Sequence, residues 1–414
     1  MGLIVQKFGG TSVGDMDRIK NAALRVIEEK NRGNEVVVVV SAMGKTTDGL
    51  VDLAYQASAK PSKREMDMLL TTGEQITISL LTMVLLESGY DAVSMTGWQA
   101  GIETEDIHGN ARITNINSDR VQQNLRDNRI VVVAGFQGMS ESREITTLGR
   151  GGSDTTAVAL AAALNADRCD IYTDVDGVYT SDPRYVKNAR KLSSVAYDEM
   201  LELANLGAGV LHPRAVEFAK NHGVPLVVRS SMEKQEGTMI EEEVSMETGL
   251  IVRGVAFEEE IIRVTVLGLQ NEITGLSSIF TTLAKNHINV DIIIQSKTET
   301  GRINLSFSIK KESLEDTIEV LQNNREDLGF STIEHESGLA KVSIVGSGMI
   351  SNPGVAAQMF EALANNQIPI KMVSTSEIKV SAVVDEAQML KAAEVLHTEF
   401  NLDKAQEPQK VSVK

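Results

Sequence analysis

Two glycine-rich turns contain the residues best suited to phosphoryl chemistry. The first, Lys7–Ser12 (Lys-Phe-Gly-Gly-Thr-Ser), follows an apolar run and precedes a helical pattern. Paired glycines let the backbone approach a phosphate closely, and consecutive N–H groups form an anion site. A lysine at the end of a strand can neutralise a phosphoryl group in transfer. An ordinary strand–helix turn has the same residue types, so this motif alone leaves both interpretations open.

The second turn, Thr147–Asp154, holds three glycines around Arg150 and again opens a helix. Ser153 or Asp154 could simply cap that helix. The arginine also has the fork geometry that binds a substrate carboxylate. The turn is not a dinucleotide fingerprint, because Asp154 stands where the third glycine of that motif would be.

The remaining polar clusters allow more than one interpretation. Gly44–Thr47 resembles the end of a Walker A loop, but Val39 stands where that motif needs its first glycine. Glu74 begins a helical pattern, where a carboxylate offsets the helix dipole unless the helix faces a cleft. The stretch Thr173–Arg184 follows an apolar run, and its ordinary interpretation is a surface turn at Asp182-Pro183. The histidines show no metal-ligand spacing and are interpreted as structural or surface residues: His108, His212, His222, His287, His335 and His397.

Short strands that alternate with helices must position these motifs. Strands buried on both faces indicate an α/β domain over residues 1–231, with a mostly parallel sheet in a three-layer αβα arrangement. The predicted strands are Leu3–Val5, Val36–Val40, Val131–Ala134, Cys169–Thr173 and Pro225–Val228. The predicted helices are Met16–Lys30, Thr72–Glu87, Asp154–Leu164 and Ser194–Leu203.

Two copies of one βαββαβ unit follow an acidic linker at 232–250. The copies span 261–336 and 341–400, and this element order is the ferredoxin-like plan. The second copy lacks its last strand, while the run Ile251–Phe257 before the first copy has no partner. We therefore expect that run to complete the second copy, so that the first is nested inside it. Residues 401–414 form a polar tail.

The composition excludes several classes of protein. The chain has 414 residues, 42% of them hydrophobic and 23% charged, as in ordinary globular proteins. With 57 acidic and 40 basic residues, its formal charge of −17 disfavours binding to nucleic acid. The single cysteine, Cys169, excludes an internal disulfide framework and a thiolate zinc site. We find no secretory segment and no apolar run long enough for a membrane span, so we expect a cytoplasmic protein.

Taken in order, these motifs resemble the aspartate kinases of the amino acid kinase family. The C-terminal copies resemble the regulatory ACT domains of that family, and the resemblance covers nearly the whole chain. The length favours the monofunctional type, without a fused dehydrogenase. The matching stretches are Lys7–Ser12, Ser41–Gly44, Gly73-Glu74, Gly135–Gly138, Thr146–Asp154 and Thr173–Tyr179.

The resemblance implies transfer of the γ-phosphoryl group of ATP to the β-carboxylate of L-aspartate, the first step toward lysine, threonine, methionine and diaminopimelate. It implies that Lys7 neutralises the phosphoryl group, that the Gly9 and Gly10 amides hold its oxygens, and that Asp154 orients Lys7. It places Glu74 on the substrate ammonium. The implied aspartate-binding residues are Ser41, Thr47, Glu74, Arg150, Gly151 and Ser153, with Arg150 on the α-carboxylate.

For the nucleotide, the resemblance implies Mg²⁺ carried by ATP, with no metal ligand from the protein. Lys7, Arg150 and Arg184 are expected to form a local cationic pocket in the acidic chain. Many relatives have a lysine near the phosphates where this chain has Gly209, and Arg214 is a candidate replacement. The implied nucleotide-binding residues are Lys7, Phe8, Gly9, Gly10, Thr173, Asp174, Tyr179, Asp182 and Arg184.

The resemblance also implies feedback inhibition by lysine, threonine or both, which the sequence does not decide. For the second copy, ordinary loop turns and a helix cap explain the residues equally well. ACT units commonly pair sheet edges between subunits, so we expect an oligomer. The implied effector-binding residues are Thr274, Gly275, Asn289, Val290, Asp291, Gln295, Ser351, Val355, Ser376 and Glu377.

Met246 follows an acidic run and precedes both regulatory copies, so a second chain started there would contain the regulatory half alone. We expect such a small subunit to join the full-length chain in an α₂β₂ assembly, although an ordinary linker methionine explains the position as well. Two rival functions remain: a kinase for another amino acid such as glutamate, and a catalytically inactive amino-acid sensor.

Overall fold

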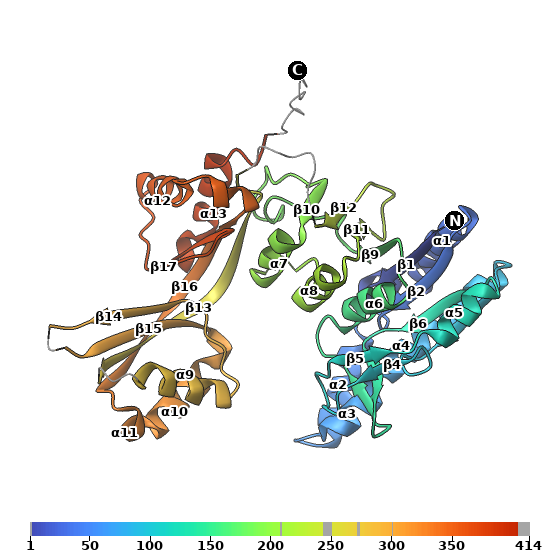
Figure 1. The fold of residues 1–414 in the computed structure, drawn as a ribbon, viewed down its shortest axis with the longest axis horizontal. Helices are drawn as coiled ribbons and strands as arrows, with labels where there is room; N and C mark the ends of the chain where they lie inside the picture. Colours follow the sequence, from blue (N-terminus) through green and yellow to red (C-terminus); the bar gives the residue numbers. More distant parts are fainter. Residues whose placement is uncertain (1, 208, 243–250, 271–273, 300, 405–414) are drawn as a thin grey trace. The chain divides into compact units, whose positions relative to one another are not determined.

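The chain forms two compact units in the computed structural model, which describes residues 2–207, 209–242, 251–270, 274–299 and 301–404 (Figure 1). The first unit is built from residues 1–179, 191–205 and 209–248, and the second from 180–190, 206–208 and 249–414. Met246 lies outside the described residues.

The segment 180–190 belongs to the second unit, although the sequence places it inside the first domain. Its Val186 is 3% exposed and packs in the core of the second unit with Val255 and Leu396. The backbone N–H of Val255 also donates to the carbonyl of Thr180 at 2.8 Å. Nothing in the local sequence signals this docking, because the buried partners lie far along the chain.

An eight-stranded sheet forms the centre of the first unit. Its order is β10-β12-β11-β9-β1-β2-β6-β3, and only β11 and β12 pair antiparallel. All five predicted strands occur in it, because β-branched runs suit strands buried on both faces. The strands are β1 (Leu3–Phe8), β2 (Glu35–Val40), β3 (Ala92–Met95), β6 (Ile130–Ala134), β9 (Arg168–Thr173), β10 (Ser194–Ala196), β11 (Leu226–Ser230) and β12 (Thr238–Glu241).

Helices cover both faces of this sheet, as the three-layer prediction requires. Helices α1 (Met16–Asn31) and α4 (Thr72–Glu87) bury Ile19 and Leu81 against the valines of β2 on one face. Helix α6 (Gly152–Ala163) packs on β1, β2 and β9. The other helices of the unit are η1 (Gly10–Val13), α2 (Thr46–Ala57), α3 (Lys63–Leu70), α5 (Asp119–Arg126), α7 (Tyr197–Asn205) and α8 (Pro213–His222).

Two features of the first unit differ from the sequence-based prediction. The helix predicted at Ser194–Leu203 is wrong in its first turn, because Ser194–Ala196 pairs with β12 and buries Val195. A small sheet in the order β5-β4-β7-β8 was not predicted at all, and it ends directly before the second glycine-rich turn. Its strands are β4 (Ile102–Thr104), β5 (Ile113–Ile116), β7 (Gln137–Ser140) and β8 (Ile145–Thr147).

The stretch Lys63–Glu87 is long and apolar enough, by length and composition, to cross a membrane. In the structure it is the two helices α3 and α4, which meet at Thr71. Its apolar residues Ile78, Leu81 and Leu85 are buried in the core beside the sheet. Other apolar residues of the stretch are exposed: Met68, Ile76, Met83 and Leu86.

The sheet topology identifies where a ligand would bind. Strand β1 pairs with β2 on one side and with β9 on the other, both in parallel. Crevices at the carboxyl ends of strands, where the strand order reverses, are the usual ligand sites of such sheets. Lys7 lies near the end of β1, and Thr173 ends β9.

A six-stranded antiparallel sheet organises the second unit, in the order β14-β15-β13-β16-β18-β17. Strand β13 (Gly254–Leu269) and strand β16 (Thr332–Val345) each run through both copies. The first half of β13 pairs with the end of β16, as Val255 opposite Ile344 shows. The predicted spare strand thus completes the second copy. The other strands are β14 (Ile293–Lys297), β15 (Ile303–Lys310), β17 (Met372–Thr375) and β18 (Lys379–Asp385).

In both copies a buried apolar residue precedes the edge strand of this sheet. In the first copy Ile288 and Ile292 are buried in the connection before β14, while all five residues of β14 itself are exposed. In the second copy Ile368 is buried before β17. The buried residues thus anchor these connections to the core, and the edge strands follow them. The helices are α9 (Gly275–Lys285), η2 (Lys311–Ser313), α10 (Leu314–Asn323), α11 (Arg325–Leu328), η3 (Ser347–Ser351), α12 (Val355–Asn365), η4 (Glu386–Gln388) and α13 (Met389–Glu399).

Candidate functional site

A buried ion pair stands at the carboxyl edge of the main sheet. The Nζ of Lys7 lies 2.6 Å from Oδ1 of Asp154, and both residues are 9% exposed. Asp154 is in the first turn of α6, where the helix dipole favours a negative charge. The pair fixes the lysine ammonium at the end of β1, as the sequence-based assignment of these two residues predicts.

Glu74 is almost completely buried in the first turn of α4. Its Oε1 accepts a hydrogen bond from the backbone N–H of Ala42 at 3.1 Å, whereas Oε2 has no partner in the described structure. Burial raises the pKa of Glu74 from 4.5 to about 7, and the bond from Ala42 offsets only part of that effect. A buried carboxylate with an unsatisfied oxygen is suited to receive a cationic group.

The second glycine-rich turn holds Arg150 between two glycines with positive φ, Gly149 at 76° and Gly151 at 67°. A Cβ on Gly151 would lie 2.1 Å from Cγ of His212, so space and backbone conformation both require glycine there. Arg150 is exposed, and no described residue bonds its guanidinium. This cation is therefore available for an anionic ligand.

The other predicted aspartate-binding residues lie in the same unit at the ends of strands or the starts of helices. Ser41 follows β2, and Thr47 is in the first turn of α2. Ser153 is 7% exposed in the first turn of α6, where its side chain fills the space beside Gly135. All three positions are compatible with a ligand at this edge of the sheet.

In the first turn the side chain of Phe8 and the N–H of Gly9 already have partners within the protein. The ring of Phe8 is 0% exposed and stacks on Tyr172, with 4.6 Å between ring centroids, so its side chain cannot touch a nucleotide. The N–H of Gly9 already donates to the carbonyl of Tyr172 at 3.3 Å. The amides that start η1, at Gly10 and Thr11, are better placed to hold phosphate oxygens, because helix N–H groups in the first turn lack intrahelical partners.

The remaining nucleotide candidates are divided between the two units. Thr173 ends β9 and donates through Oγ1 to the carboxylate of the exposed Asp174 at 3.1 Å. Tyr179 is half-buried and donates to Asp176 at 2.9 Å. Asp182 and Arg184 belong to the second unit, where the guanidinium of Arg184 binds the Asp182 carboxylate at 2.6 Å.

Arg214, the candidate replacement for the lysine cation, is bonded to neutral oxygens of the first unit. Its guanidinium donates to the Leu148 carbonyl at 2.6 Å and to Oδ1 of Asn110 and the Ala111 carbonyl, both at 3.0 Å. Burial lowers the pKa of this group. The bond to Leu148 holds the turn that carries Arg150, so Arg214 has a bracing role.

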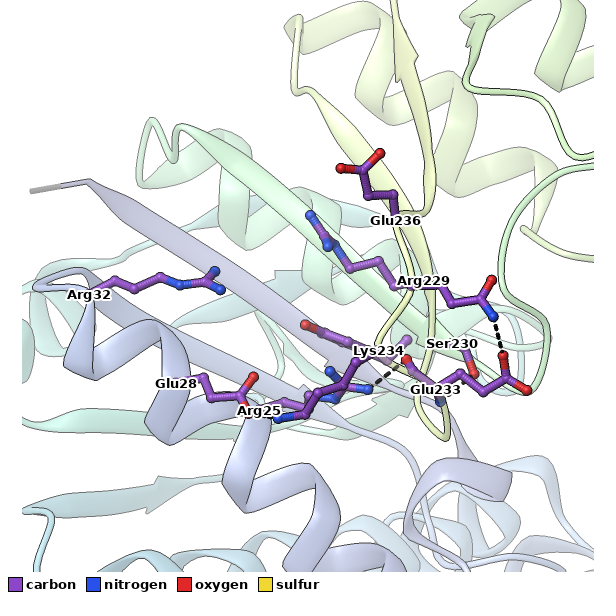
Figure 2. A pocket seen from close by; sticks show the side chains of 10 residues that line it. Arg25, Glu28, Arg32, Arg229, Ser230, Glu233, Lys234 and Glu236 are labelled. Carbon is purple, nitrogen blue, oxygen red and sulfur yellow. Dashed lines mark hydrogen bonds and ion pairs between the residues drawn. The ribbon is translucent and has the colours of Figure 1, made fainter.

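A separate cavity of about 210 Å³ lies between α1 and the loop that follows β11 (Figure 2). Its charged lining residues bond mainly to one another: Lys234 pairs with Glu28, and Arg25 donates to the carbonyl of Glu233. Arg229 lies 3.4 Å from the buried Asp170. The charged residues around this cavity therefore have a structural explanation, since their contacts bind the loop after β11 to α1.

The predicted effector residues all belong to the second unit. Asn289 and Gln295 are exposed, Gln295 on edge strand β14, and Thr274 and Gly275 begin α9. In the second copy Ser351 ends η3, the buried Val355 begins α12, and Ser376 and Glu377 form the exposed turn between β17 and β18. Both sets thus include residues at the start of the first helix of their copy, α9 and α12.

Asp291 is half-exposed and already has a cationic partner. The Nζ of Lys341, a residue only 6% exposed, lies 2.5 Å from Oδ2 of Asp291 and 2.8 Å from Oε2 of Glu258. Burial alone would lower the pKa of Lys341, but its bonds to Asp291 and Glu258 outweigh burial and raise it. A ligand ammonium at Asp291 would therefore have to compete with Lys341.

No pattern in the sequence indicated the residues that brace the site. His108 and Asp67 are bonded to each other at 2.8 Å, and His212 caps α8 by accepting the Arg214 N–H at 3.3 Å. The interpretation of both histidines as structural fits these contacts. Their partners are far apart in the chain, so residue spacing could not have identified the network. Among the residues that the structure describes, no group of three His, Cys, Asp or Glu side chains could hold a metal.

Comparisons with known proteins agree with this architecture. Residues 2–230 match the amino acid kinase family, and residues 264–324 and 342–400 match an ACT domain. The chain is 73% identical over 402 residues to an aspartokinase of Bacillus sp. (strain MGA3), a match that covers 97% of this chain and 98% of that protein.

Two solved structures of aspartokinase III from E. coli are also similar to this chain. One, in complex with aspartate and ADP in the R-state, matches with a TM-score of 0.80 and 26% identity over 96% of this chain and 99% of that chain. The other, with lysine and aspartate in the T-state, matches with a TM-score of 0.76 and 27% identity over the same shares. The chain therefore belongs to the aspartokinases of the amino acid kinase family, with tandem ACT domains at its C-terminus.

Proposed function

We propose that the chain transfers the γ-phosphoryl group of ATP to the β-carboxylate of L-aspartate, giving 4-phospho-L-aspartate, and that an end-product amino acid inhibits it through the ACT copies. The observation that carries this proposal is the buried Lys7–Asp154 pair at the same sheet edge as the buried Glu74 and the unpaired Arg150. The aspartate and ADP bound to the E. coli relative support this choice of substrates.

Each of these groups has a role that its charge and surroundings allow. Glu74 receives the α-ammonium, and Arg150 holds the α-carboxylate in its planar fork. Lys7 cancels the charge that develops on the phosphoryl group, and Asp154 keeps the lysine at the end of β1. Phosphoryl transfer needs mainly positioning and charge cancellation, so no covalent intermediate on the protein is required.

The nucleotide enters as its Mg²⁺ complex, which is part of the substrate. The first-turn amides of η1, at Gly10 and Thr11, hold phosphate oxygens, while Thr173, Asp174 and Tyr179 contribute to nucleotide binding. The magnesium ion reduces the negative charge of the phosphates. We infer a cytoplasmic location, where ATP and aspartate are both available.

For regulation, we assign the effector to the residues around Asp291 and Gln295, with lysine or threonine as candidates. The lysine bound to the E. coli relative supports an amino acid of this class. Exposed β14 presents Ile293 and Ile294, which are 49% and 37% exposed, on an unpaired sheet edge. A second copy of the chain that pairs along such edges would cover them and form an oligomer.

A direct assay tests the reaction. Hydroxylamine traps an acyl phosphate as a hydroxamate, so the parent protein should form hydroxamate with MgATP and aspartate and far less with glutamate. Lys7→Ala should reduce turnover by about 10²-fold or more, because one preorganised charge is removed. Equal rates with both amino acids would favour a different amino acid kinase, and no product with either would favour the sensor.

A small subunit that starts at Met246 is part of the same proposal and can be tested separately. The gene is expressed in parallel with a variant whose Met246 codon is changed to a codon that does not initiate translation. Only the parent gene should give an additional band of regulatory-domain size. A band that persists in the variant would reject internal initiation there.

A further inference from the structure

Asp67 is a buried carboxylate that the proposed reaction does not use. It lies on α3 and is 0% exposed. Its Oδ1 accepts the hydroxyl of Thr147 at 2.5 Å, and its Oδ2 contacts Nδ1 of His108 at 2.8 Å and accepts the N–H of Gly109 at 3.1 Å. A buried carboxylate is stable only with donors of this kind. We call Asp67, His108, Gly109 and Thr147 the Asp67 network.

The network connects three segments of the first unit at one point. Thr147 is the last residue of β8 and the first of the glycine-rich turn, and its carbonyl accepts the N–H of Ala111 at 2.9 Å. Arg214 bonds both the Leu148 and the Ala111 carbonyls. The start of the turn is therefore bound to α3, to the 108–111 loop and to α8.

This attachment is one of the bonds that hold the turn of Arg150, together with those of Leu148 to Arg214 and Phe136. Arg150 lies between two positive-φ glycines, and no described residue forms a hydrogen bond or ion pair with its guanidinium. Its position depends on the bonds of its turn: Thr147 to Asp67 at one end, Leu148 to Arg214, and the start of α6 at the other end. Releasing Thr147 from Asp67 would let the arginine move.

The same helix pair carries the opposite end of the substrate site. Helices α3 and α4 meet at Thr71, whose N–H donates to the Asp67 carbonyl at 3.2 Å, and Glu74 follows in the first turn of α4. The carbonyl of Thr71 also accepts a bond from the Gln137 side chain at 3.1 Å. One rigid segment therefore presents Glu74 and holds the turn of Arg150.

We propose that Asp67 is a positioning residue that keeps Arg150 and Glu74 at a fixed separation and so determines the affinity and selectivity for aspartate. This inference rests on the proposed function. The two groups hold the ammonium and carboxylate on Cα of the substrate, which fixes how far its side chain reaches toward Lys7. Glutamate is one methylene longer. When its α-ammonium and α-carboxylate are held at fixed positions, its side-chain carboxylate is misplaced relative to Lys7.

The test compares variants that remove or keep single contacts of the network. Thr147→Val removes the hydroxyl that Asp67 accepts, whereas Thr147→Ser retains it. Asp67→Asn removes an acceptor that binds His108 and Gly109. Thr147→Val and Asp67→Asn should raise KM for aspartate about tenfold or more, the effect expected from losing a hydrogen bond to a charged group. The KM for ATP should stay within about twofold, because Lys7 and η1 make no contact with the network.

Selectivity provides the readout that a general loss of stability would not change. In Thr147→Val the ratio of kcat/KM for aspartate to that for glutamate should fall severalfold, and Thr147→Ser should restore it. Asp106→Asn is a matched control, since Asp106 is an exposed carboxylate in the same loop that bonds Ser142 and not the turn. Titration of aspartate without ATP measures binding independently of turnover.

Several outcomes would overturn the inference. One is a KM for aspartate in Thr147→Val that stays within twofold of the parent. Another is a parallel rise in both KM values, or a loss of kcat alone, which would show a purely structural contact. Thr147→Val is the deciding variant if Asp67→Asn does not fold. If the parent itself neither binds nor phosphorylates aspartate, the proposed function fails first and this inference falls with it.

Discussion

The protonation of Glu74 should control how tightly aspartate binds. The buried carboxylate has a pKa of about 7 in the unliganded protein, and it must be ionised to pair with the substrate ammonium. Aspartate itself keeps its charges between pH 6 and 8 because its groups titrate outside that range. Protonated Glu74 therefore competes with the substrate as pH falls through 7.

The magnitude follows from the fraction of protein with ionised Glu74. The apparent KM for aspartate is multiplied by a factor of one plus the ratio of protonated to ionised Glu74. This ratio is negligible at pH 8 and about ten at pH 6. At saturating MgATP, we expect KM to rise about tenfold between these pH values. The kcat should change much less, because bound aspartate holds Glu74 in its ionised form.

The ionisation of Glu74 should also change the stability of the protein, and here the ionised form is the unfavourable one. The folded protein binds the Glu74 proton more tightly than the unfolded chain, so ionisation destabilises the fold. That cost is absent below pH 4.5, grows between pH 4.5 and 7, and is complete above 7. The shift corresponds to about 3 kcal/mol, so unliganded Glu74→Gln should unfold at higher temperature than the parent above pH 7 and similarly to it near pH 4.5.

Steady-state rates from pH 6 to 8 and thermal unfolding of both proteins measure these effects. Glu74→Gln should bind aspartate weakly with a KM that does not vary with pH, since its amide cannot titrate. The reasoning is refuted if the parent's KM is constant over this range. It is also refuted if Glu74→Gln keeps the parent's pH dependence.

Three further substitutions test the neighbouring assignments. Arg150→Ala should raise KM for aspartate far more than KM for ATP in steady-state rates, and equal changes would remove Arg150 from the aspartate site. Gln295→Ala should weaken feedback inhibition without lowering uninhibited turnover. The lost coupling energy between effector and substrate sites should lie within the usual range of about 1–3 kcal/mol. A parallel loss of inhibition and turnover would argue against an independent regulatory site. Lys341→Met should lower the effector concentration that gives half inhibition, because it frees Asp291; unchanged inhibition would exclude competition between Lys341 and the effector.

The sequence by itself determined the parts of the molecule that local chemistry controls. The β-branched runs formed the five predicted strands, because such residues fit a sheet buried on both faces. The glycines around Arg150 indicated a tight turn, which the positive φ of Gly149 and Gly151 confirms. The repeated element order in the C-terminal half, together with the spare run Ile251–Phe257, likewise predicted the nested pair of copies.

Tertiary structure alone decided which side chains meet. Phe8 lies in the glycine-rich turn by sequence, yet its ring is buried and stacks on Tyr172 of strand β9. The segment 180–190 follows the kinase strands in sequence and docks in the core of the second unit. Asp67 and Thr147 are eighty residues apart, and only the packing of α3 beside β8 brings a carboxylate to that hydroxyl. Spacing in a sequence reports neighbours within one element, whereas contacts between elements depend on how the whole core packs.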